Sequence, residues 1–293
     1  MRKSMLVGLV GANISNSLSP ALHEDAFATA GIAGHYHLMD VNRLKGRSLE
    51  DLLTAVRTAG FAAINVTHPF KEAIIPLLDE VSAGARQIGA VNTVVIDPLG
   101  RTIGHNTDRS GFCRGFEETL GRAAAGDREV LLLGAGGAGR AVAFALMDLG
   151  VSRLLVHDKE QARAATLCAD LMVKFGPNRC TLVASPNDGV ESAAGIVNAT
   201  PVGMLGYAGM PIAETLIHPG HWVADIVYTP LETQLIAKAR ARGCRVMTGG
   251  SMCVHQAADA FRLFTGLSPD VARMRRLFDK ACAERDAALA AAG

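Results

Sequence analysis

Apolar runs of strand length alternate with amphipathic stretches along nearly the whole chain. In the amphipathic stretches, such as residues 48–60 and 140–150, apolar side chains recur with the period of a helix. Strands that alternate with helices form parallel sheets covered on both faces, so the pattern predicts an α/β fold. The apolar runs cover residues 5–11, 35–41, 61–67, 90–97, 129–136, 153–158, 180–185, 195–200, 221–228 and 244–249.

A boundary between two domains is expected after the stretch GHNTD, which ends at Asp108. A helical stretch follows, and a connector rich in glycine and alanine then leads into the most apolar strand. A chain of 293 residues is long enough for two buried cores. We expect an N-terminal open α/β substrate domain over 1–108, completed by C-terminal helices over 256–293, and a Rossmann doubly wound domain over 109–255. The two domains are expected to close on the substrate.

Composition and charge narrow the class of protein. Hydrophobic residues make up 49% of the chain and charged residues 19%, which is typical of globular proteins and excludes disorder. The net charge of +1 gives no field that would recruit nucleic acid or an anionic membrane. The apolar run near the N-terminus is short and leads into polar residues without a cleavage site, so it predicts a strand and not a signal peptide. We expect a cytoplasmic monomer or homodimer with a small-molecule substrate and no nucleic-acid or membrane partner.

The spacing of cysteine and histidine gives no metal signal. The six cysteines include no C-x-x-C pair, and the nine histidines include no H-E-x-x-H pattern. Isolated side chains of these types rarely assemble a zinc site. A chain of this size without a secretory signal does not need a disulfide framework either. We therefore expect no metal site and no disulfide framework.

A glycine-rich turn between a strand and a helix is typical of dinucleotide binding. It has the form G-x-G-x-x-G at Gly134, Gly136 and Gly139, and the next strand ends in Asp158, 19 residues beyond Gly139. The first glycine permits the tight turn, the second lets the backbone approach a pyrophosphate, and the third lets the helix pack on the strand. The helix N-terminus offers N–H groups and a partial positive charge to the phosphates. The whole unit, and not the glycines alone, predicts a bound dinucleotide.

Asp158 distinguishes between the two nicotinamide cofactors. A carboxylate at the end of the second strand accepts hydrogen bonds from the adenosine ribose and repels the 2′-phosphate of NADP. Glu160 adds a second negative charge, and Lys159 offsets part of it. We expect NAD as the cofactor and NADP as a weaker one. Capping of the following helix is an alternative role for Asp158, compatible with the first.

A series of short motifs spans nearly the whole chain in a fixed order. They read NSLSPALHEDAF, NVTHPFKE, GAVNTVV, GHNTD, GAGGAGRAV, NATPVGM, ADIVYTPLET and VHQAADAFRLFTG. This series resembles the shikimate dehydrogenase family, and within it the NAD-using quinate/shikimate dehydrogenases. The NADP enzymes of the family typically carry Asn-Arg-Thr where this chain has Asp158-Lys159-Glu160. The chain departs from the family at Arg109, where most members have glycine, which leaves the local turn undetermined.

The resemblance implies that Lys71 and Asp108 form the catalytic pair. The implied reaction is reversible oxidation of the C3 hydroxyl of quinate or shikimate to 3-dehydroquinate or 3-dehydroshikimate, with NAD taking the hydride. Desolvation lowers the pKa of a lysine and a neighbouring carboxylate raises it, so the sequence leaves two assignments open. Lys71 accepts the proton, or it orients the hydroxyl while Asp108 shares the proton. Without the resemblance, Lys71 would be a solvated residue at a helix start and Asp108 a helix cap.

The remaining site residues are also implied by the resemblance. Hydroxyls and amides suit a small polyol carboxylate, because hydroxyls donate to the carboxylate and amides both donate and accept at the hydroxyls. The expected substrate residues are Ser17 and Ser19, which would point the same way in an extended segment, with Thr67, Asn92, Tyr228 and Gln256, and more weakly Asn65 and Asn106. The expected cofactor residues are Gly134, Ala135, Gly136, Gly137, Ala138, Gly139, Asp158, Lys159, Arg163, Asn198, Thr200, Val227, Gly250 and Met252.

Two other functions fit parts of the pattern. One is the biosynthetic, NADP-dependent shikimate dehydrogenase. The other, of a different class, is a non-catalytic regulatory protein that binds a pathway metabolite. Such a sensor needs neither Lys71 nor Asp108, and this chain keeps both and carries no added DNA-binding segment. We therefore expect an oxidoreductase of quinate catabolism or aromatic amino acid biosynthesis.

Overall fold

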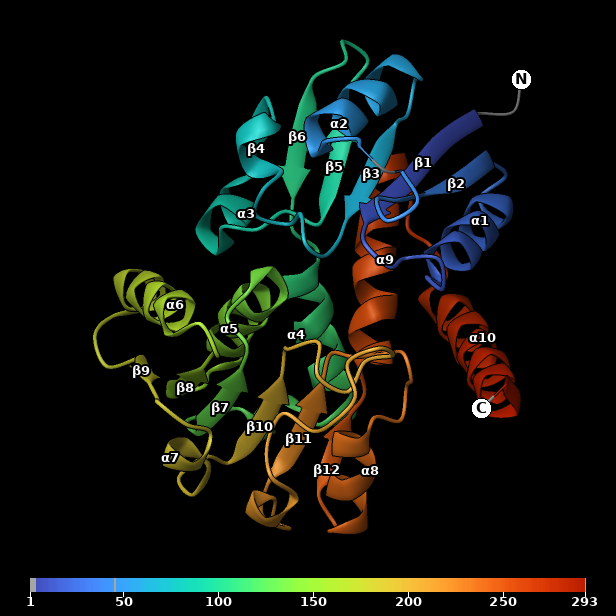
Figure 1. The fold of residues 1–293 in the computed structure, drawn as a ribbon. Helices are drawn as coiled ribbons and strands as arrows, with labels where there is room; N and C mark the ends of the chain where they lie inside the picture. The colour runs from blue at the N-terminus through green and yellow to red at the C-terminus, as the bar shows by residue number, and fades with distance from the viewer. Residues whose placement is uncertain (1–3, 45, 293) are drawn as a thin grey trace. The chain divides into compact units, whose positions relative to one another are not determined.

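The computed structural model describes residues 4–44 and 46–292, which fold into two compact units (Figure 1). The first unit contains residues up to 107 together with 256–281, and the second contains 108–255 together with the residues from 282 onward. Each unit has a six-stranded sheet in the described part of the chain. The predicted α/β fold with two domains is confirmed.

The sheet of the first unit has the strand order β2-β1-β3-β5-β6-β4. Most neighbours run parallel, as predicted, but β5 runs antiparallel to both β3 and β6. The exception arises because a tight turn joins β5 directly to β6, and a hairpin forces antiparallel pairing. The strands are β1 (Ser4–Gly11), β2 (Ala33–Asp40), β3 (Ala63–Val66), β4 (Glu80–Val81), β5 (Thr93–Ile96) and β6 (Thr102–His105).

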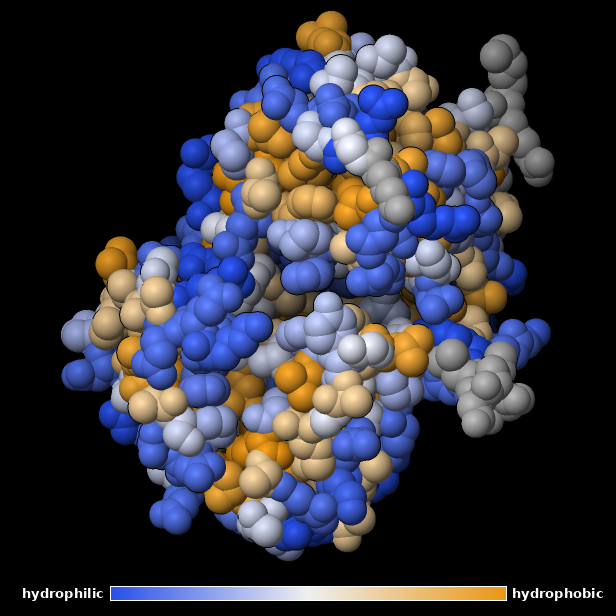
Figure 2. All heavy atoms as spheres, in the orientation of Figure 1, coloured by the Kyte–Doolittle hydropathy of each residue, from blue (hydrophilic) through white to orange (hydrophobic). Residues whose placement is uncertain are grey.

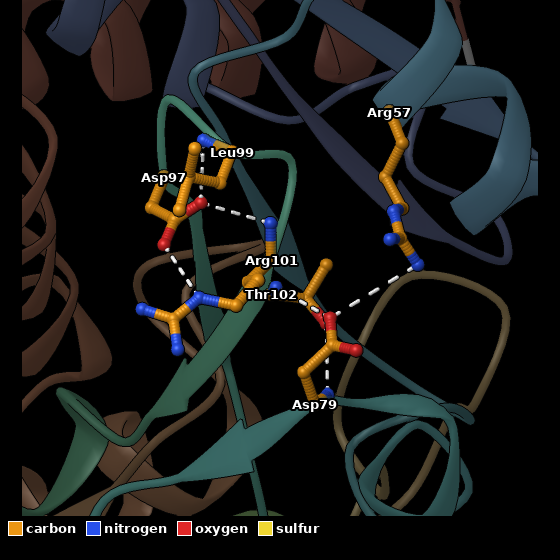
Figure 3. A network of polar contacts seen from close by, with 6 residues as sticks. All are labelled: Arg57, Asp79, Asp97, Leu99, Arg101 and Thr102. Carbon is orange, nitrogen blue, oxygen red and sulfur yellow. Dashed lines mark hydrogen bonds and ion pairs between the residues drawn. The ribbon is translucent and has the colours of Figure 1, made fainter.

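Two aspartates hold the β5–β6 hairpin and the start of β4 (Figure 3). Asp97 Oδ1 accepts hydrogen bonds from the backbone N–H groups of Leu99 and Arg101, at 2.8 and 2.9 Å. Asp79 Oδ2 accepts from the backbone N–H and the hydroxyl of Thr102, both at 2.7 Å. These side chains stabilise β6, which the apolar pattern did not predict because it is short and contains a glycine.

The helices of the first unit begin with clear local signals. Pro20 follows the first residue of α1 (Ser19–Thr29), and Ser48 forms a capping box with Asp51 at the start of α2 (Leu49–Thr58). A short α3 (Ala83–Ile88) follows Ser82, whose hydroxyl caps it.

The chain passes between the units three times. It passes once after Thr107 and then twice inside helices, in α9 (Gly249–Thr265) and α10 (Val271–Ala292). The C-terminal range that the sequence assigned to the first domain is therefore divided, and residues from 282 onward join the second unit. The reason is local: Arg285 and Asp286 hydrogen-bond to the segment 228–231.

The second unit has an all-parallel sheet in the order β12-β11-β10-β7-β8-β9. This is the doubly wound order of a Rossmann domain, with its switch point between β7 and β10. The strands are β7 (Glu129–Leu133), β8 (Arg153–His157), β9 (Cys180–Leu182), β10 (Gly195–Asn198), β11 (Trp222–Asp225) and β12 (Arg245–Met247). The helices are α4 (Asp108–Thr119), α5 (Gly137–Leu149), α6 (Gln161–Phe175), α7 (Asn187–Val190) and α8 (Gln234–Ala241).

One disulfide is present among the described residues, between Cys168 of α6 and Cys180 of β9. The sequence predicted no disulfide framework. The bond forms because α6 returns along the sheet edge beside β9 and brings the two Cα atoms within 5.1 Å. The two cysteines are 12 positions apart, and that spacing is no recognised disulfide signal.

The surface carries apolar side chains in small groups among hydrophilic ones, as Figure 2 shows for one face. Exposed apolar residues in small groups are normal on globular proteins. Within the described ranges, no group of three or more His, Cys, Asp and Glu residues could hold a metal ion. No described helix has the length and apolar character needed to span a membrane.

Candidate active site

The two substrate-side serines lie where the segment after β1 enters α1. Ser17 Oγ donates to Ser19 Oγ at 3.1 Å, and the backbone N–H of Ser19 donates to Ser17 Oγ at 3.3 Å. Both side chains are half-buried. The two hydroxyls therefore lie together as expected, although Ser19 begins a helix and the segment is not extended. Adjacent hydroxyls of this kind can donate to the two oxygens of one carboxylate.

A buried amide lies at the start of β5. Asn92 is 4% exposed, its Oδ1 accepts from the backbone N–H of Thr107 at 2.8 Å, and its Nδ2 donates to Thr107 Oγ1 at 2.9 Å. Thr107 Oγ1 also donates to Gln256 Oε1 of α9, at 3.5 Å. The structure thus brings together Asn92 and Gln256, both expected to bind substrate. Thr107 joins them and was missed, although its place beside Asp108 in the motif GHNTD could have drawn attention to it.

The hydrogen bonds of Asn92 continue into the sheet. Tyr36 Oη donates to Asn65 Oδ1 at 2.8 Å, and Asn65 Nδ2 donates to Thr93 Oγ1 at 3.0 Å and to the carbonyl of Asn92 at 3.2 Å. Thr93 Oγ1 then donates to Asn92 Oδ1 at 2.9 Å. These groups are buried and mutually bonded, so they fix the orientation of Asn92. Asn65 thus supports a candidate substrate residue, and Tyr36 does so without any local sequence signal.

Thr67 and Lys71 lie in the segment that follows β3. The backbone N–H of Thr67 donates to the carbonyl of Val10 at 3.0 Å, which fixes the end of β3 beside β1. The carbonyl of Lys71 accepts from the N–H of Val91 at 2.8 Å. Lys71 lies in a turn and is half-buried.

The glycine-rich loop between β7 and α5 has the geometry that a pyrophosphate requires. Gly134 has a φ of +100°, and a Cβ on Gly139 would lie 2.1 Å from the carbonyl oxygen of Gly134. Both positions therefore require glycine. The nearest atom that a Cβ on Gly136 would meet is Arg163 Nη1, 4.0 Å away. Helix geometry leaves the first N–H groups of α5 without partners inside the helix, so the loop fits a bound pyrophosphate.

Asp158 follows β8 and bonds directly to this loop. Its Oδ2 accepts from the N–H of Ala135 at 2.7 Å, and its Oδ1 accepts from the N–H of Glu160 at 2.8 Å. Glu160 occupies the cap position of α6, so Asp158 is not the helix cap. Each carboxylate oxygen has capacity for a second hydrogen bond, which suits a ribose diol. Lys159 is exposed nearby, and Arg163 Nε forms an ion pair with Glu160 at 2.9 Å.

The ends of β10 and β11 are joined through Asp225, which is not among the predicted site residues. Asp225 is 1% exposed, and its Oδ1 accepts from Asn198 Nδ2 at 2.9 Å and from the N–H of Val227 at 3.0 Å. Its Oδ2 accepts from Thr233 Oγ1 at 2.7 Å. Burial raises the pKa of Asp225 to about 6, against the opposing effect of these hydrogen bonds.

Asn198 also shapes the loop after β10. Its Oδ1 accepts from the N–H and the hydroxyl of Thr200, at 3.0 and 2.7 Å. The start of α9 lies against the next loop, because a Cβ on Gly249 would lie 2.4 Å from the carbonyl of Ile226 and 2.5 Å from that of Val227. Gly250 and Met252 follow in α9 and are buried. The cofactor candidates at these strand ends therefore lie in ordered, bonded loops.

Asp108 is the first residue of α4 and is buried. Arg109 continues the same helix, which resolves the local turn that the sequence left undetermined. Its Nε and Nη2 donate to the two oxygens of Asp148 at 2.6 and 2.7 Å, and its guanidinium lies over the ring of Phe144. Arg109 thus joins α4 to α5.

Two segments of the chain match domains of a known protein family. Residues 9–94 match the shikimate dehydrogenase substrate binding domain, and residues 251–277 match the shikimate 5'-dehydrogenase C-terminal domain. The quinate/shikimate dehydrogenase (NAD(+)) of Corynebacterium efficiens is 49% identical over 279 residues, which is 94% of this chain and 98% of that protein. The chain belongs to the shikimate dehydrogenase family. The family prediction made from the motifs is therefore confirmed, and with it the prediction of an enzyme.

Other members of the shikimate dehydrogenase family are similar as well. The solved structure of quinate dehydrogenase from Corynebacterium glutamicum in complex with NAD has a TM-score of 0.87 and 46% identity, covering 95% of this chain and 100% of that chain. The shikimate dehydrogenase (NADP(+)) of Streptomyces avermitilis is 48% identical over 276 residues, 92% of this chain and 94% of that protein. Members named for either cofactor thus lie at similar identity, so the residues around the ribose have to discriminate between them.

Proposed function

We propose that this shikimate dehydrogenase family member reversibly oxidises the C3 hydroxyl of quinate or shikimate with NAD as the hydride acceptor. The observation that carries the choice of cofactor is the Asp158 carboxylate, held by the N–H of Ala135 at the glycine-rich loop. A negative charge there suits a ribose diol and repels a 2′-phosphate. The names of the relatives from Corynebacterium efficiens and Corynebacterium glutamicum support the same cofactor.

The substrate residues in this proposal are Ser17, Ser19, Thr67, Asn92, Tyr228 and Gln256. The hydroxyls of Ser17 and Ser19 donate to the substrate carboxylate. The side chains of Thr67, Asn92 and Gln256 bind its ring hydroxyls, because an amide both donates and accepts. A ligand held by several fixed groups of this kind loses little further freedom before it reacts.

Lys71 and Asp108 handle the proton of the C3 hydroxyl. NAD held by its pyrophosphate at the glycine-rich loop would supply the hydride acceptor, so the protein has to accept one proton and stabilise the developing ketone. Lys71 takes the proton at Nζ, or it polarises the hydroxyl oxygen while Asp108 takes the proton at its carboxylate. Both assignments give the same products, the ketone, the reduced cofactor and a proton.

The deciding experiment is a matrix of quinate and shikimate against NAD and NADP, followed by the absorbance of the reduced nicotinamide. Turnover with at least one of the two substrates, and a higher kcat/KM with NAD than with NADP, is the expected result. A higher kcat/KM with NADP would favour the second candidate, the NADP-dependent shikimate dehydrogenase, which the Streptomyces avermitilis relative supports. Substrate binding without turnover under all four conditions would favour a metabolite-binding regulator. We further expect a monomer or homodimer that acts in the cytoplasm.

A further inference from the structure

The loop between β11 and α8 contains Tyr228, one of the proposed substrate residues. Arg285 of α10 bonds to this loop twice: its Nη2 donates to the carbonyl oxygen of Tyr228 at 2.7 Å, and its Nη1 donates to Thr229 Oγ1 at 2.9 Å. Asp286 Oδ2 accepts from the backbone N–H of Leu231 at 3.4 Å. The last turns of α10 therefore bond to three of the four residues in the segment 228–231.

The two helix residues also hold each other. Arg285 Nε donates to Asp286 Oδ1 at 3.0 Å, and the side chains of Arg285 and Asp286 are 12% and 32% exposed. A guanidinium this deeply buried has to be partnered, and its planar fork of donors matches a carbonyl and a hydroxyl that lie side by side. Arg285 is therefore committed to this loop and is not a solvated residue on the helix surface.

The loop is fixed independently at its two ends. Asp225 bonds to the N–H of Val227 and to the hydroxyl of Thr233, which in turn caps α8 by accepting from the N–H of Ile236. Removal of the Arg285 bonds would leave these two anchors in place. The middle of the loop would keep the bond from the backbone N–H of Leu205 to the carbonyl of Thr229, at 2.8 Å, and the bond between Leu231 and Asp286. It would lose the two bonds that hold the Tyr228 carbonyl and the Thr229 hydroxyl.

We propose that Arg285 and Asp286 are positioning residues, which act through the 228–231 backbone to hold Tyr228 where the substrate meets it. This inference rests on the proposed function of Tyr228. Val227, the cofactor candidate next to this segment, keeps its own bond to Asp225, so the larger effect should fall on the substrate and the smaller one on the dinucleotide.

The test compares Arg285→Ala and Arg285→Lys with the control Arg276→Ala, an exposed arginine of the same helix. We expect kcat/KM for quinate or shikimate to fall roughly 10- to 100-fold in Arg285→Ala, since small misplacements at a site have effects of that size. The dissociation constant for NAD should change less than about twofold. Arg285→Lys should recover only part of the loss. Its ammonium can still donate to one acceptor, but it cannot reproduce the planar fork of donors. An unchanged kcat/KM, or an equal loss of NAD affinity, would overturn the proposal.

Two further measurements keep the test decisive. Thr229→Val removes one of the acceptors and leaves Arg285 in place, so it serves if Arg285→Ala does not fold, and a smaller loss of kcat/KM is expected from it. Amide hydrogen exchange over 226–233 should accelerate in Arg285→Ala and stay unchanged in Arg276→Ala. If the parent protein turned over neither substrate, the proposed function would fail, but the exchange data would still show whether the helix holds the loop. Equal exchange in the parent and Arg285→Ala would refute that contact.

Discussion

Burial and hydrogen bonding act against each other at the Asp225 carboxyl group. Its position at the end of β11 removes it from water, which favours the protonated form, while donors from Val227, Thr233 and Asn198 favour the carboxylate. Burial has the larger effect, and the pKa rises from its ordinary value of 3.8 to about 6. The folded protein therefore holds this proton more tightly than the unfolded chain does.

Asp225 should make the stability of the protein depend on pH below neutrality. Because the folded pKa lies above the unfolded one, stability falls as the pH rises through the window between 3.8 and about 6. Asp225→Asn removes this group while an amide oxygen can still accept from Val227. As the pH rises across that window, the free energy of unfolding of Asp225→Asn minus that of the parent should therefore increase by up to roughly 3 kcal/mol. Urea unfolding of both proteins at a series of pH values measures it, and a pH-independent difference would contradict the expectation.

Lys71 should be required for turnover. Lys71→Met keeps the length of the side chain and removes the charge and the proton acceptor, so kcat/KM should fall by about 100-fold or more. Lys174→Met, at an exposed lysine near the end of α6, is the matched control and should match the parent. Initial rates with quinate or shikimate, whichever is turned over faster, measure this effect. Equal rates in Lys71→Met and the parent would remove Lys71 from the mechanism.

Asp158 should set the cofactor ratio. In Asp158→Asn the charge is lost while one oxygen remains to accept from Ala135, so the ratio of kcat/KM with NADP to that with NAD should rise by about tenfold, the equivalent of about 1.4 kcal/mol. Glu191→Gln removes an exposed charge elsewhere in the second unit and should leave the ratio unchanged. A ratio that did not move in Asp158→Asn would assign the discrimination to other residues.

Elements with a strong local signal were predictable from the sequence, and those that depend on distant partners were not. The buried strands β7, β8, β10 and β11 are apolar runs, and the glycine-rich loop with Asp158 is recognised by its spacing together with the strand before it and the helix after it. β6 was missed because side chains from outside the strand, including Asp79, stabilise it. Thr107, Tyr36 and Asp225 were missed for a related reason: each acts through hydrogen bonds to residues that only the fold brings near.

The β7–α5 unit should tolerate no side chain at its last glycine. A Cβ in Gly139→Ala would lie 2.1 Å from the carbonyl oxygen of Gly134, so strand and helix would have to separate. We expect a loss of roughly 1–3 kcal/mol in the free energy of unfolding, together with weaker NAD binding. Gly84→Ala in α3 is the control, since its Cβ would meet no described atom within 4 Å, and it should be neutral or stabilising. Urea unfolding that placed the two variants at equal stability would contradict this.

The first unit needs residues 256–281 for its core. Phe261 and Phe264 of α9 belong to the same buried cluster as Val7 of β1 and Phe27 of α1, and the rings of Phe27 and Phe261 lie 5.4 Å apart. We therefore expect a fragment of residues 1–107 to lack cooperative unfolding, because it has lost these aromatic contacts. A fusion of the same fragment to 256–281 through a flexible linker should restore a sigmoidal transition. Cooperative unfolding of 1–107 alone would show that the aromatic residues are dispensable.

Because the first unit is built from two separate stretches of the chain, the two units should fold in a definite order during synthesis on the ribosome. The strands translated first have to wait for α9, and at roughly 5–20 residues per second the intervening 148 residues, 108–255, take on the order of ten seconds to synthesise. During that interval β1 and α1 expose apolar side chains that chaperones recognise. The Rossmann unit has nearly all of its chain by then, so the half of the protein that emerges second should fold first.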